Sequence, residues 1–470
     1  MFILIRLLIK IYIICMSCVF SISVFANDKL EDRLIDVLNL NNDINPNVKI
    51  DFTKKNQKNV DELGFVLYDL IRKRDFNKVN EIIDEYISHE KHDKNLVRYI
   101  LSEKAIVNQE YDTAVTLYNE ILLEQPNLLM IELKLAVAFI SIKRYEDALL
   151  VYQTLINKYE KKLPLNLSRF INNQIRILKS KNSWQGTVKI GSSYDFNLNE
   201  ASNNRDLYCF RKRCMGSGSK SIAGGQWHYA IELSKRYPLS GNHTAQLLFD
   251  VVGLEPMKAV STRKKSASFK GGYQFEKTNK KIRLLPVIEA RWRDNQYNNL
   301  SLGVKFAAEY ELTNKITLFS DLEVKSKNYI DEYHFNDGNK LTYSFMSTYL
   351  VNPRLVVFGK IHGVNRNKKF QSDSYQQYGS KIGMLTMVGS YELLVVTGYK
   401  YTKFKQFDDY INTKRKDHNW YLNTQVTVES NKILSFTPSV YFNSQVNKST
   451  ANIIYAFKQS EVGVNFTKKF

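Results

Sequence analysis

The chain has 470 residues, a formal net charge of +20, and many aromatic residues, with 29 Tyr and 26 Phe. This length is enough for two or three domains, and after the first residues no run reaches the roughly 20 apolar residues that a membrane-spanning helix needs. The positive charge could attract nucleic acid, anionic lipid or acidic protein. It is spread along the chain and no nucleic-acid-binding module is recognisable, so we interpret it mostly as solvated surface and expect no nucleic-acid partner.

Residues 1–26 have the pattern of a secretory signal peptide. Arg6 and Lys10 carry positive charge near the start, a long apolar run follows, and Val24-Phe25-Ala26 fits a small-residue cleavage site. This order is typical of signal peptides that are cut from exported proteins. An uncleaved membrane anchor is the alternative, because the apolar run is long. Residues 27–57 are polar and rich in Asn and Lys, and we expect them to form a flexible leader.

Residues 58–182 have the pattern of an α-helical domain with an internal repeat. Four residues recur after 34 positions, and we predict that all eight pack the repeats together: Leu101, Tyr111, Ala114 and Tyr118, then Leu135, Tyr145, Ala148 and Tyr152. This period is that of tetratricopeptide repeats. A degenerate copy surrounds Phe76, shifted by one residue, and residues 168–181 would form a closing helix. Such arrays usually bind a protein segment on a concave surface. An ordinary helical bundle is the alternative.

From Trp184 onward the helical period is replaced by an alternation of polar and apolar residues, which indicates β-strands. We predict fourteen antiparallel strands, at residues 185–197, 226–237, 242–254, 265–276, 281–293, 297–312, 314–327, 340–351, 354–365, 375–388, 391–404, 418–430, 433–445 and 457–470. Their even number, their length and their alternately short and long connections are typical of outer-membrane β-barrels. A soluble β-sandwich is the alternative, although it gives no reason for that alternation. Residues 294–296 are an exception, because a long connection is expected there.

The segment EVGVNFTKKF, residues 461–470, places Val462, Val464, Phe466 and Phe470 on one face. A terminal Phe after alternating apolar residues resembles the signal that outer-membrane barrels present to their assembly machinery. Lys468 departs from this pattern, which usually has an apolar or aromatic residue there. The alternative is that Phe470 is a frayed tail.

The first strand of the barrel continues into a run in which polar and apolar residues still alternate. We expect Tyr194, Phe196 and Leu198 to face lipid or the external aromatic girdle, whereas Asp195, Asn197 and Asn199 line a polar lumen. A calcium site is the alternative for the three polar residues, but it would require a turn and further oxygen ligands.

Cys209 and Cys214 lie in the segment CFRKRC, and a close pair of cysteines in an exported protein predicts a disulfide. A metal site is the alternative.

Five histidines lie in the barrel region, His228, His243, His334, His362 and His418. A catalytic triad could be imagined around any of them, but no Ser-centred elbow stands out. We therefore expect them to be loop or lumen residues, and we expect no enzyme, cofactor or metal.

The order of a leader, a short tetratricopeptide region and a fourteen-strand barrel resembles the surface lipoprotein assembly modulator (Slam) family, the outer-membrane translocators of the type XI secretion system. The local likeness lies at the start of the barrel, in Trp184, Gly191, Asp195, Asn197 and Asn199. The resemblance implies a multi-pass barrel in the outer membrane (residues 183–470) with its repeat domain in the periplasm. The long loop that contains the two cysteines departs from the family pattern.

The resemblance also implies function. Family members move surface lipoproteins, or soluble haem- and metal-capture proteins, across the outer membrane. The implied partners are a cargo protein, the barrel-assembly machinery and outer-membrane lipid, and we expect a monomer. The alternative functions are an exopolysaccharide export porin, which also joins such repeats to a barrel, a barrel enzyme and a passive pore.

Overall fold

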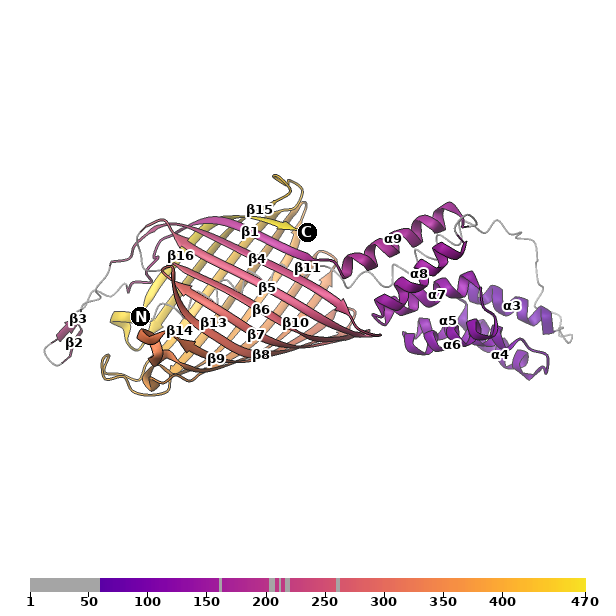
Figure 1. Ribbon diagram of the computed structural model, residues 1–470, viewed down its shortest axis with the longest axis horizontal. Coiled ribbons are helices and arrows are strands. Elements are labelled where there is room, and N and C mark those ends of the chain that lie inside the picture. Colours follow the sequence, from indigo (N-terminus) through magenta and orange to yellow (C-terminus); the bar gives the residue numbers. More distant parts are fainter. Residues whose placement is uncertain (1–59, 160–162, 203–207, 211–212, 216–219, 259–262) are drawn as a thin grey trace. The chain divides into compact units, whose positions relative to one another are not determined.

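The structure is a computed structural model that describes residues 60–159, 163–202, 208–210, 213–215, 220–258 and 263–470. The predicted signal peptide, residues 1–26, and the predicted leader, residues 27–57, lie outside the described residues. The chain divides into two compact units, one helical and one a β-barrel (Figure 1). Within the described residues, no helix has the length and apolar character required to cross a membrane.

In the described part of the chain, the helical unit has three successive helix pairs and one further helix. Its elements are α3 (Val60–Arg72), α4 (Phe76–Ser88), α5 (Lys94–Val107), α6 (Tyr111–Glu124), α7 (Leu129–Ser141), α8 (Tyr145–Tyr159) and α9 (Leu165–Lys181). From α5 to α9, each helix contacts the next one along the chain. The predicted fold class, helical repeats followed by an antiparallel barrel of fourteen strands, is confirmed.

The turn inside each helix pair has the same geometry. Arg74, Gln109 and Lys143 have φ angles of 58°, 63° and 64°, and each lies two residues before the second helix of its pair. This left-handed conformation is unfavourable for residues with a Cβ atom, so its recurrence indicates one shared backbone design. The turn therefore also identifies the degenerate first repeat around Phe76.

Five of the eight predicted packing residues are buried, two are partly buried and one is exposed. Ala114, Ala148, Tyr118, Tyr152 and Leu135 belong to the helical core, and Tyr111 and Tyr145 pack partly buried against it. The prediction was wrong for Leu101, whose side chain is 41% exposed. The reason is that α7, which carries Leu135, is buried along most of its surface, whereas α5 buries only one face.

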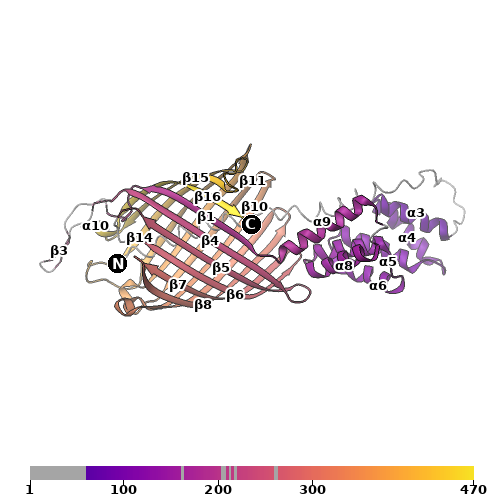
Figure 2. The same cartoon turned by 45° about the horizontal axis from the view of Figure 1, so that its top comes forward.

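The β unit is a closed barrel of fourteen antiparallel strands. They are β1 (Gln185–Asp195), β4 (Gly224–Pro238), β5 (His243–Pro256), β6 (Lys264–Lys277), β7 (Lys280–Arg293), β8 (Gln296–Thr313), β9 (Ile316–Tyr329), β10 (Gly338–Asn352), β11 (Leu355–Arg366), β12 (Tyr375–Val388), β13 (Tyr391–Phe404), β14 (Lys416–Val428), β15 (Thr437–Ser449) and β16 (Phe457–Lys469). The strands tilt strongly against the barrel axis, and β1 lies between β4 and β16 (Figure 2). A closed barrel leaves no strand edge unpaired.

The two ends of the barrel differ in their connections. One end, here the loop end, carries the connections that follow β1, β5, β7, β9, β11, β13 and β15. These include a hairpin, β2 (Tyr208–Phe210) and β3 (Arg213–Met215), and the short helices η1 (Asp331–Asn336), η2 (Gln371–Asp373) and α10 (Asn452–Tyr455). The opposite end, the turn end, has mostly two-residue turns. The predicted exception is confirmed, because only Asp294 and Asn295 connect β7 to β8 at the loop end.

One predicted strand was misplaced. The sequence pattern predicts a strand at 433–445, whereas β15 spans Thr437–Ser449. Ile433 and Phe436 instead pair as an isolated bridge, and between them Leu434 and Ser435 have φ angles of 50° and 68°. Two such residues form a tight hairpin turn, and neither residue type signals one in the sequence.

Candidate functional site: the barrel lumen and its closing seam

The inner face of the barrel is the candidate functional site, because it carries most of the buried polar side chains of the β unit. Along the strands, exposed apolar residues alternate with these polar ones. Ile361 and Ile382 are among the most exposed residues of the outer face, and their neighbours Lys360 and Lys381 therefore point inward. The described residues contain no group of His, Cys, Asp and Glu side chains that could hold a metal ion.

The predicted polar run at the start of the barrel makes hydrogen bonds that connect the end of β1 to β16. The Asp195 carboxylate accepts hydrogen bonds from the backbone N–H of Asn197 at 2.8 Å and from the amide of Gln459 in β16. The Asn197 amide donates to the carbonyls of Ala201 and Lys458 at 3.0 and 2.9 Å. The run therefore fastens the end of β1 to β16.

The third residue of the run, Asn199, binds a different segment. Its amide donates to the carbonyl of Lys220 at 3.0 Å, and its carbonyl accepts from the N–H of Ile222 at 2.9 Å. The side-chain oxygens that a calcium site would require thus accept protein hydrogen bonds at all three positions. We interpret the run as a structural element that shapes the loop after β1.

Two details of this region differ from the prediction. The strand ends at Asp195, and a turn follows at residues 196–199. Because the turn breaks the alternation, Leu198 points inward and is only 4% exposed, so the prediction that it faces lipid was wrong. Tyr194 and Phe196 are exposed as expected, and their rings pack edge to face.

Gly191 has a steric role in the seam between β1 and β16. A Cβ atom there would lie 2.5 Å from the carbonyl oxygen of Val464 and would collide with the imidazole of His228. That imidazole is hydrogen-bonded to the side-chain carbonyl of Asn465 at 2.6 Å. The glycine thus leaves room for a polar contact between β4 and β16 that crosses β1.

Glu461 of β16 is the centre of the largest hydrogen-bonded cluster at this seam. Its carboxylate accepts bonds from Ser193 in β1 at 2.7 Å, from Gln226 in β4 at 2.8 Å, and from Tyr441 and Asn443 in β15 at 3.0 and 3.1 Å. One buried carboxylate therefore links four neighbouring strands. This role could not be predicted from the sequence, because the partners of Glu461 come from distant segments.

The residues of the predicted assembly signal lie on β16 or directly after it. Val462, Val464 and Phe466 are exposed on the outer face of β16. Phe470 is not a frayed tail, because its backbone N–H and carbonyl bond to Gly186 at 3.0 and 2.8 Å. Recognition by the assembly machinery stays a prediction.

Trp184 precedes β1, and its exposed ring lies 5.5 Å from the ammonium of Lys235. An exposed Trp beside a Lys at the end of a barrel strand suits the aromatic girdle of a membrane interface. The five positions of the predicted motif thus divide into an exposed aromatic residue beside a lysine, a glycine at the seam and three hydrogen-bonded polar residues.

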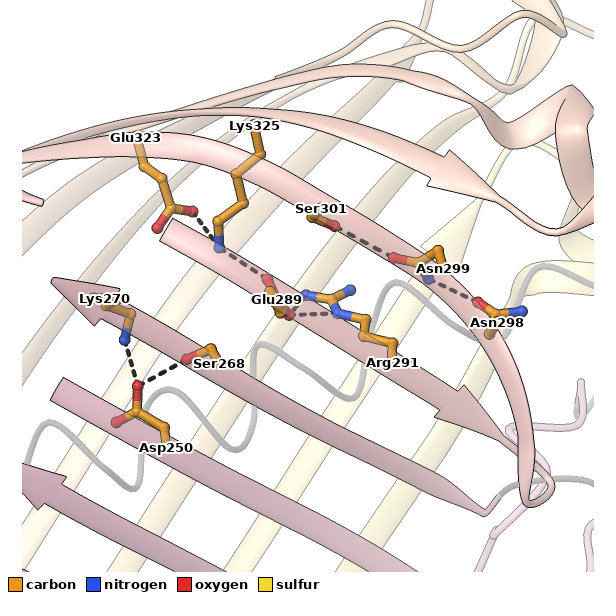
Figure 3. A network of polar contacts seen from close by, with 10 residues as sticks. All are labelled: Asp250, Ser268, Lys270, Glu289, Arg291, Asn298, Asn299, Ser301, Glu323 and Lys325. Atoms are coloured by element: carbon orange, nitrogen blue, oxygen red, sulfur yellow. Dashed lines mark hydrogen bonds and ion pairs between the residues drawn. The ribbon is translucent and has the colours of Figure 1, made fainter. Parts of the chain in front are cut away.

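Ion pairs cover the inner face of β5 to β9 (Figure 3). Glu289 of β7 binds the Arg291 guanidinium and the Lys325 ammonium, which also lies 3.0 Å from Glu323. On β5 and β6, Asp250 pairs with Lys270 and accepts a hydrogen bond from Ser268 at 2.9 Å. This wall of the lumen is strongly charged, and its acids and bases are interleaved.

These charged lumen residues were not predicted from the sequence. The signal that could have found them is the spacing of two, as in Glu289 and Arg291 or Glu323 and Lys325, which places both side chains on the inner face of one strand. Their pairing across strands depends on the register, which alternation alone does not specify.

Polar contacts also order the connections at the loop end. The Lys368 ammonium lies 3.4 Å from the Asp373 carboxylate, and both side chains are almost completely buried. Burial lowers the pKa of Lys368 and raises the pKa of Asp373. Burial therefore disfavours the charged form of both groups, although the ion pair requires both charges. The guanidinium of Arg415 binds Asp417 and lies 3.3 Å from the ring centroid of Tyr455 in α10.

Cys209 and Cys214 are opposite each other in the backbone register of the β2–β3 hairpin, and the disulfide between them stays a prediction.

The histidines of the barrel region lie in separate places. His243 contacts Tyr273, His334 bridges Asp331 and Asp337, and His418 contacts Tyr399. His228 belongs to the seam, and His362 lies on the inner face of β11. In the described barrel their hydrogen-bond partners thus do not form a Ser-His-Asp arrangement.

The repeat domain has its own buried polar cluster. Glu103 of α5 accepts a hydrogen bond from the Tyr118 hydroxyl at 2.6 Å and pairs with the Lys134 ammonium at 2.7 Å. These three residues come from three successive helices. Burial, and then the Glu103 charge, raises the pKa of Tyr118 well above its ordinary value, so the hydroxyl remains a donor.

Comparison with known proteins identifies both parts of the chain. Residues 184–470 match the family model described as surface lipoprotein assembly modifier, and residues 51–161 match the model of its N-terminal tetratricopeptide repeats. A hemophilin secretion modulator of Acinetobacter baumannii is 20% identical over 438 residues, which cover 88% of this chain and 87% of that protein. A surface lipoprotein assembly modifier of Pasteurella multocida is 21% identical over 418 residues, which cover 83% of this chain and 79% of that protein.

Solved structures show more distant likenesses. The outer-membrane channel DcaP of Acinetobacter baumannii has a TM-score of 0.36 and 9% identity, covering 61% of this chain and 96% of that one. A bacterial polysaccharide outer-membrane secretin has a TM-score of 0.32 and 10% identity, covering 62% and 99%. These scores are too low to support an argument about function.

Proposed function

Because the chain belongs to the surface lipoprotein assembly modifier family, we propose that it is a translocator that moves a cargo protein across the outer membrane. Its barrel is an outer-membrane barrel with fourteen spanning strands. In this proposal, residues 183–470 form the membrane domain, and residues 58–182 form a periplasmic repeat domain that binds the cargo before it passes. The supporting observation is the joining of a helical repeat array to a closed barrel with a charged inner face.

The cargo proposed is a surface lipoprotein or a secreted haem- or metal-capture protein. Support comes from the names of the two relatives, since one is a hemophilin secretion modulator and the other a surface lipoprotein assembly modifier. We further propose that the chain acts as a monomer, without chemical catalysis, and that the barrel-assembly machinery inserts it into outer-membrane lipid.

The experiment that tests this function is a surface-display assay. The gene is deleted, and intact cells and culture medium are probed for the proteins encoded beside it, with and without complementation. We expect one neighbouring protein to remain inside the mutant cells and to return to the surface or the medium on complementation. Unchanged protein display together with loss of a surface polysaccharide would replace the translocator with the export porin.

A further inference from the structure

One part of the lumen carries bases without the interleaved acids found on β5 to β9. Among the four strands β10 to β13, the acidic residue is Glu392 alone. Glu392 lies at the turn end of β13, eight residues from Lys400 and thus roughly 27 Å away at about 3.4 Å per residue. The lumen-facing bases of these strands are Lys340, Lys360, His362, Arg366, Lys381 and Lys400.

Four of these residues form a patch, here named the cationic wall: Lys360, His362, Lys381 and Lys400. The register places Lys360 directly opposite Lys381, and it places His362 and Lys400 on either side of Gly379. The four side chains therefore lie on three successive strands, about 4.8 Å apart, near the middle of the barrel. Like charges opposite each other destabilise a sheet, so the opposed pair Lys360 and Lys381 does not stabilise the barrel by itself.

Aromatic rings lie against two of these lysines. The Lys381 ammonium lies 5.7 Å from the centroid of Phe358, and the Lys400 ammonium lies 4.8 Å from that of Tyr421. Cation–π contacts hold an ammonium group in place, but a neutral ring leaves the positive charge in the lumen. Among the described residues, Lys381 makes no ion pair.

Glycines leave the space that the rings around these lysines occupy. A Cβ atom at Gly383 would collide with the Phe358 ring, one at Gly398 with the Tyr421 ring, and one at Gly379 with the His362 ring. Each glycine thus accommodates a ring of the neighbouring strand. The combination of glycine, ring and lysine gives the wall a fixed geometry.

The residues directly opposite the wall on its two flanking strands are neutral. Across β10 they are Ser344 and Met346, and across β14 the residue opposite Lys400 is Asn419. One strand further, on β9, Asp321 makes an ion pair with Lys305 at 3.0 Å, and the charge of Asp321 also acts on Lys360. The residues directly opposite the cationic wall on β10 and β14 thus add no negative charge to it.

We propose that the cationic wall binds an acidic segment of the cargo polypeptide while it passes through the lumen. This inference rests on the proposed function. In an extended peptide, alternate side chains lie on one side and are about 6.8 Å apart, so carboxylates at such positions can meet lysines on neighbouring strands. The contact is electrostatic and therefore weakens as salt concentration rises, which allows the segment to be released.

The binding test uses the purified full chain in a non-ionic detergent. The probe is a fluorescein-labelled peptide of ten glutamates, and its affinity is measured by fluorescence anisotropy at low and high salt. We expect the triple variant Lys360→Gln, Lys381→Gln, Lys400→Gln to bind at least tenfold more weakly than the natural chain. Heat-dependent gel migration checks that the variant barrel is folded.

The matched control removes the same charge elsewhere. Lys280→Gln, Lys315→Gln and Lys403→Gln neutralise three exposed lysines outside the wall, and we expect affinity within twofold of the natural chain. Equal affinity of both triple variants would overturn the proposal. Displacement of the peptide by an equal concentration of inorganic phosphate would also overturn it, since the wall would then select small anions.

The same variants separate this inference from the proposed function in cells. We expect the cationic-wall variant to display at least fivefold less cargo than the control variant at equal barrel abundance. Normal display by a variant that no longer binds the peptide would overturn the inference but not the function. If gene deletion itself leaves display unchanged, the proposed function fails, and the peptide-binding result still decides whether the wall binds acidic peptide.

Discussion

At the scale of single residues, the Glu461 carboxylate has the largest predicted effect on the barrel. It accepts hydrogen bonds from β1, β4 and β15. Glu461→Gln replaces one accepting oxygen with a donor that faces other donors. We expect the free energy of unfolding to fall by about 2 kcal/mol or more, because hydrogen bonds to charged groups contribute about 1.5–3 kcal/mol each. Urea unfolding in detergent, followed by tryptophan fluorescence, measures the change.

The matched control for this substitution is Glu309→Gln. Glu309 also lies on a barrel strand, but it belongs to β8, away from the seam. We expect its substitution to leave the unfolding midpoint nearly unchanged. Equal effects of the two substitutions would show that the network around Glu461 adds no stability of its own.

Gly191 and Gly359 allow a second comparison at this scale. A Cβ atom at Gly191 would overlap atoms of β4 and β16, whereas one at Gly359 would meet no atom within 4 Å. We expect Gly191→Ala to cost about 1–3 kcal/mol, the usual effect of overpacking, and Gly359→Ala to be nearly neutral. The fraction of folded barrel on unheated gels reports the difference, and a neutral Gly191→Ala would contradict the assigned role.

At the scale of the elements, two equivalent tyrosines in successive repeats differ in their hydrogen bonding. The Tyr118 hydroxyl donates to Glu103, whereas the buried Tyr152 hydroxyl has no hydrogen-bond partner within the described residues. We expect Tyr118→Phe to destabilise the repeats by about 1.5–3 kcal/mol and Tyr152→Phe to stabilise them by up to about 1 kcal/mol. Loss of the helical circular dichroism signal in urea measures the stability of both variants. Stability changes of the same sign in the two variants would contradict the prediction.

The same tyrosines predict the response of the repeats to alkaline pH. Burial raises the pKa of Tyr152 and, together with Glu103, that of Tyr118. A raised pKa in the folded state gives stability that is complete below the ordinary tyrosine pKa, near 10, and is lost as pH rises toward the folded value. We expect the urea midpoint of the helical signal to fall above about pH 10, and to fall less in Tyr152→Phe.

Much of the element pattern could be predicted from the sequence, and the exceptions have local causes. The 34-residue period and the strict alternation located helices and strands because each element buries one face. The strand at 433–445 was misplaced because Leu434 and Ser435 adopt left-handed turn angles that their residue types do not indicate. Leu198 was misassigned because the turn at 196–199 ends the alternation.

The chemistry of the lumen could not be predicted in the same way. Glu461 and the cationic wall depend on which residues of different strands lie opposite each other, and a shift of one residue would reverse every side chain. The polar run Asp195, Asn197 and Asn199 at the start of the barrel could be singled out from the sequence. Its hydrogen bonds to Gln459 and Ile222 could not be predicted, because only the closed barrel brings those segments together.

At the scale of the whole molecule, the seam between β1 and β16 bears on the route of the cargo. Its register is continuous from Thr187 to Asp195, and polar clusters reinforce it on the inner face. We therefore expect transport without opening of this seam. The double variant Tyr194→Cys, Val462→Cys joins an outward-facing register pair, and oxidation should lock the seam while cargo display stays within twofold of the reduced state.

The control for this experiment locks another pair of strands. Ile361 and Ser380 are opposite each other on β11 and β12, so a disulfide between cysteines at these positions has no effect on the seam. If oxidation stops display only in the Tyr194 and Val462 variant, the seam opens during transport and the expectation is wrong.

The closing of the barrel also has a consequence for how the chain folds. Consecutive strands pair as local hairpins, but β1 meets β16 only after every strand between them is in place. Closing a loop of that length is entropically unfavourable and slow. Until then the growing sheet has two edges with unsatisfied backbone groups, which can pair with any other strand. The seam that removes all edges from the finished barrel therefore makes the last folding intermediate the state most prone to aggregation.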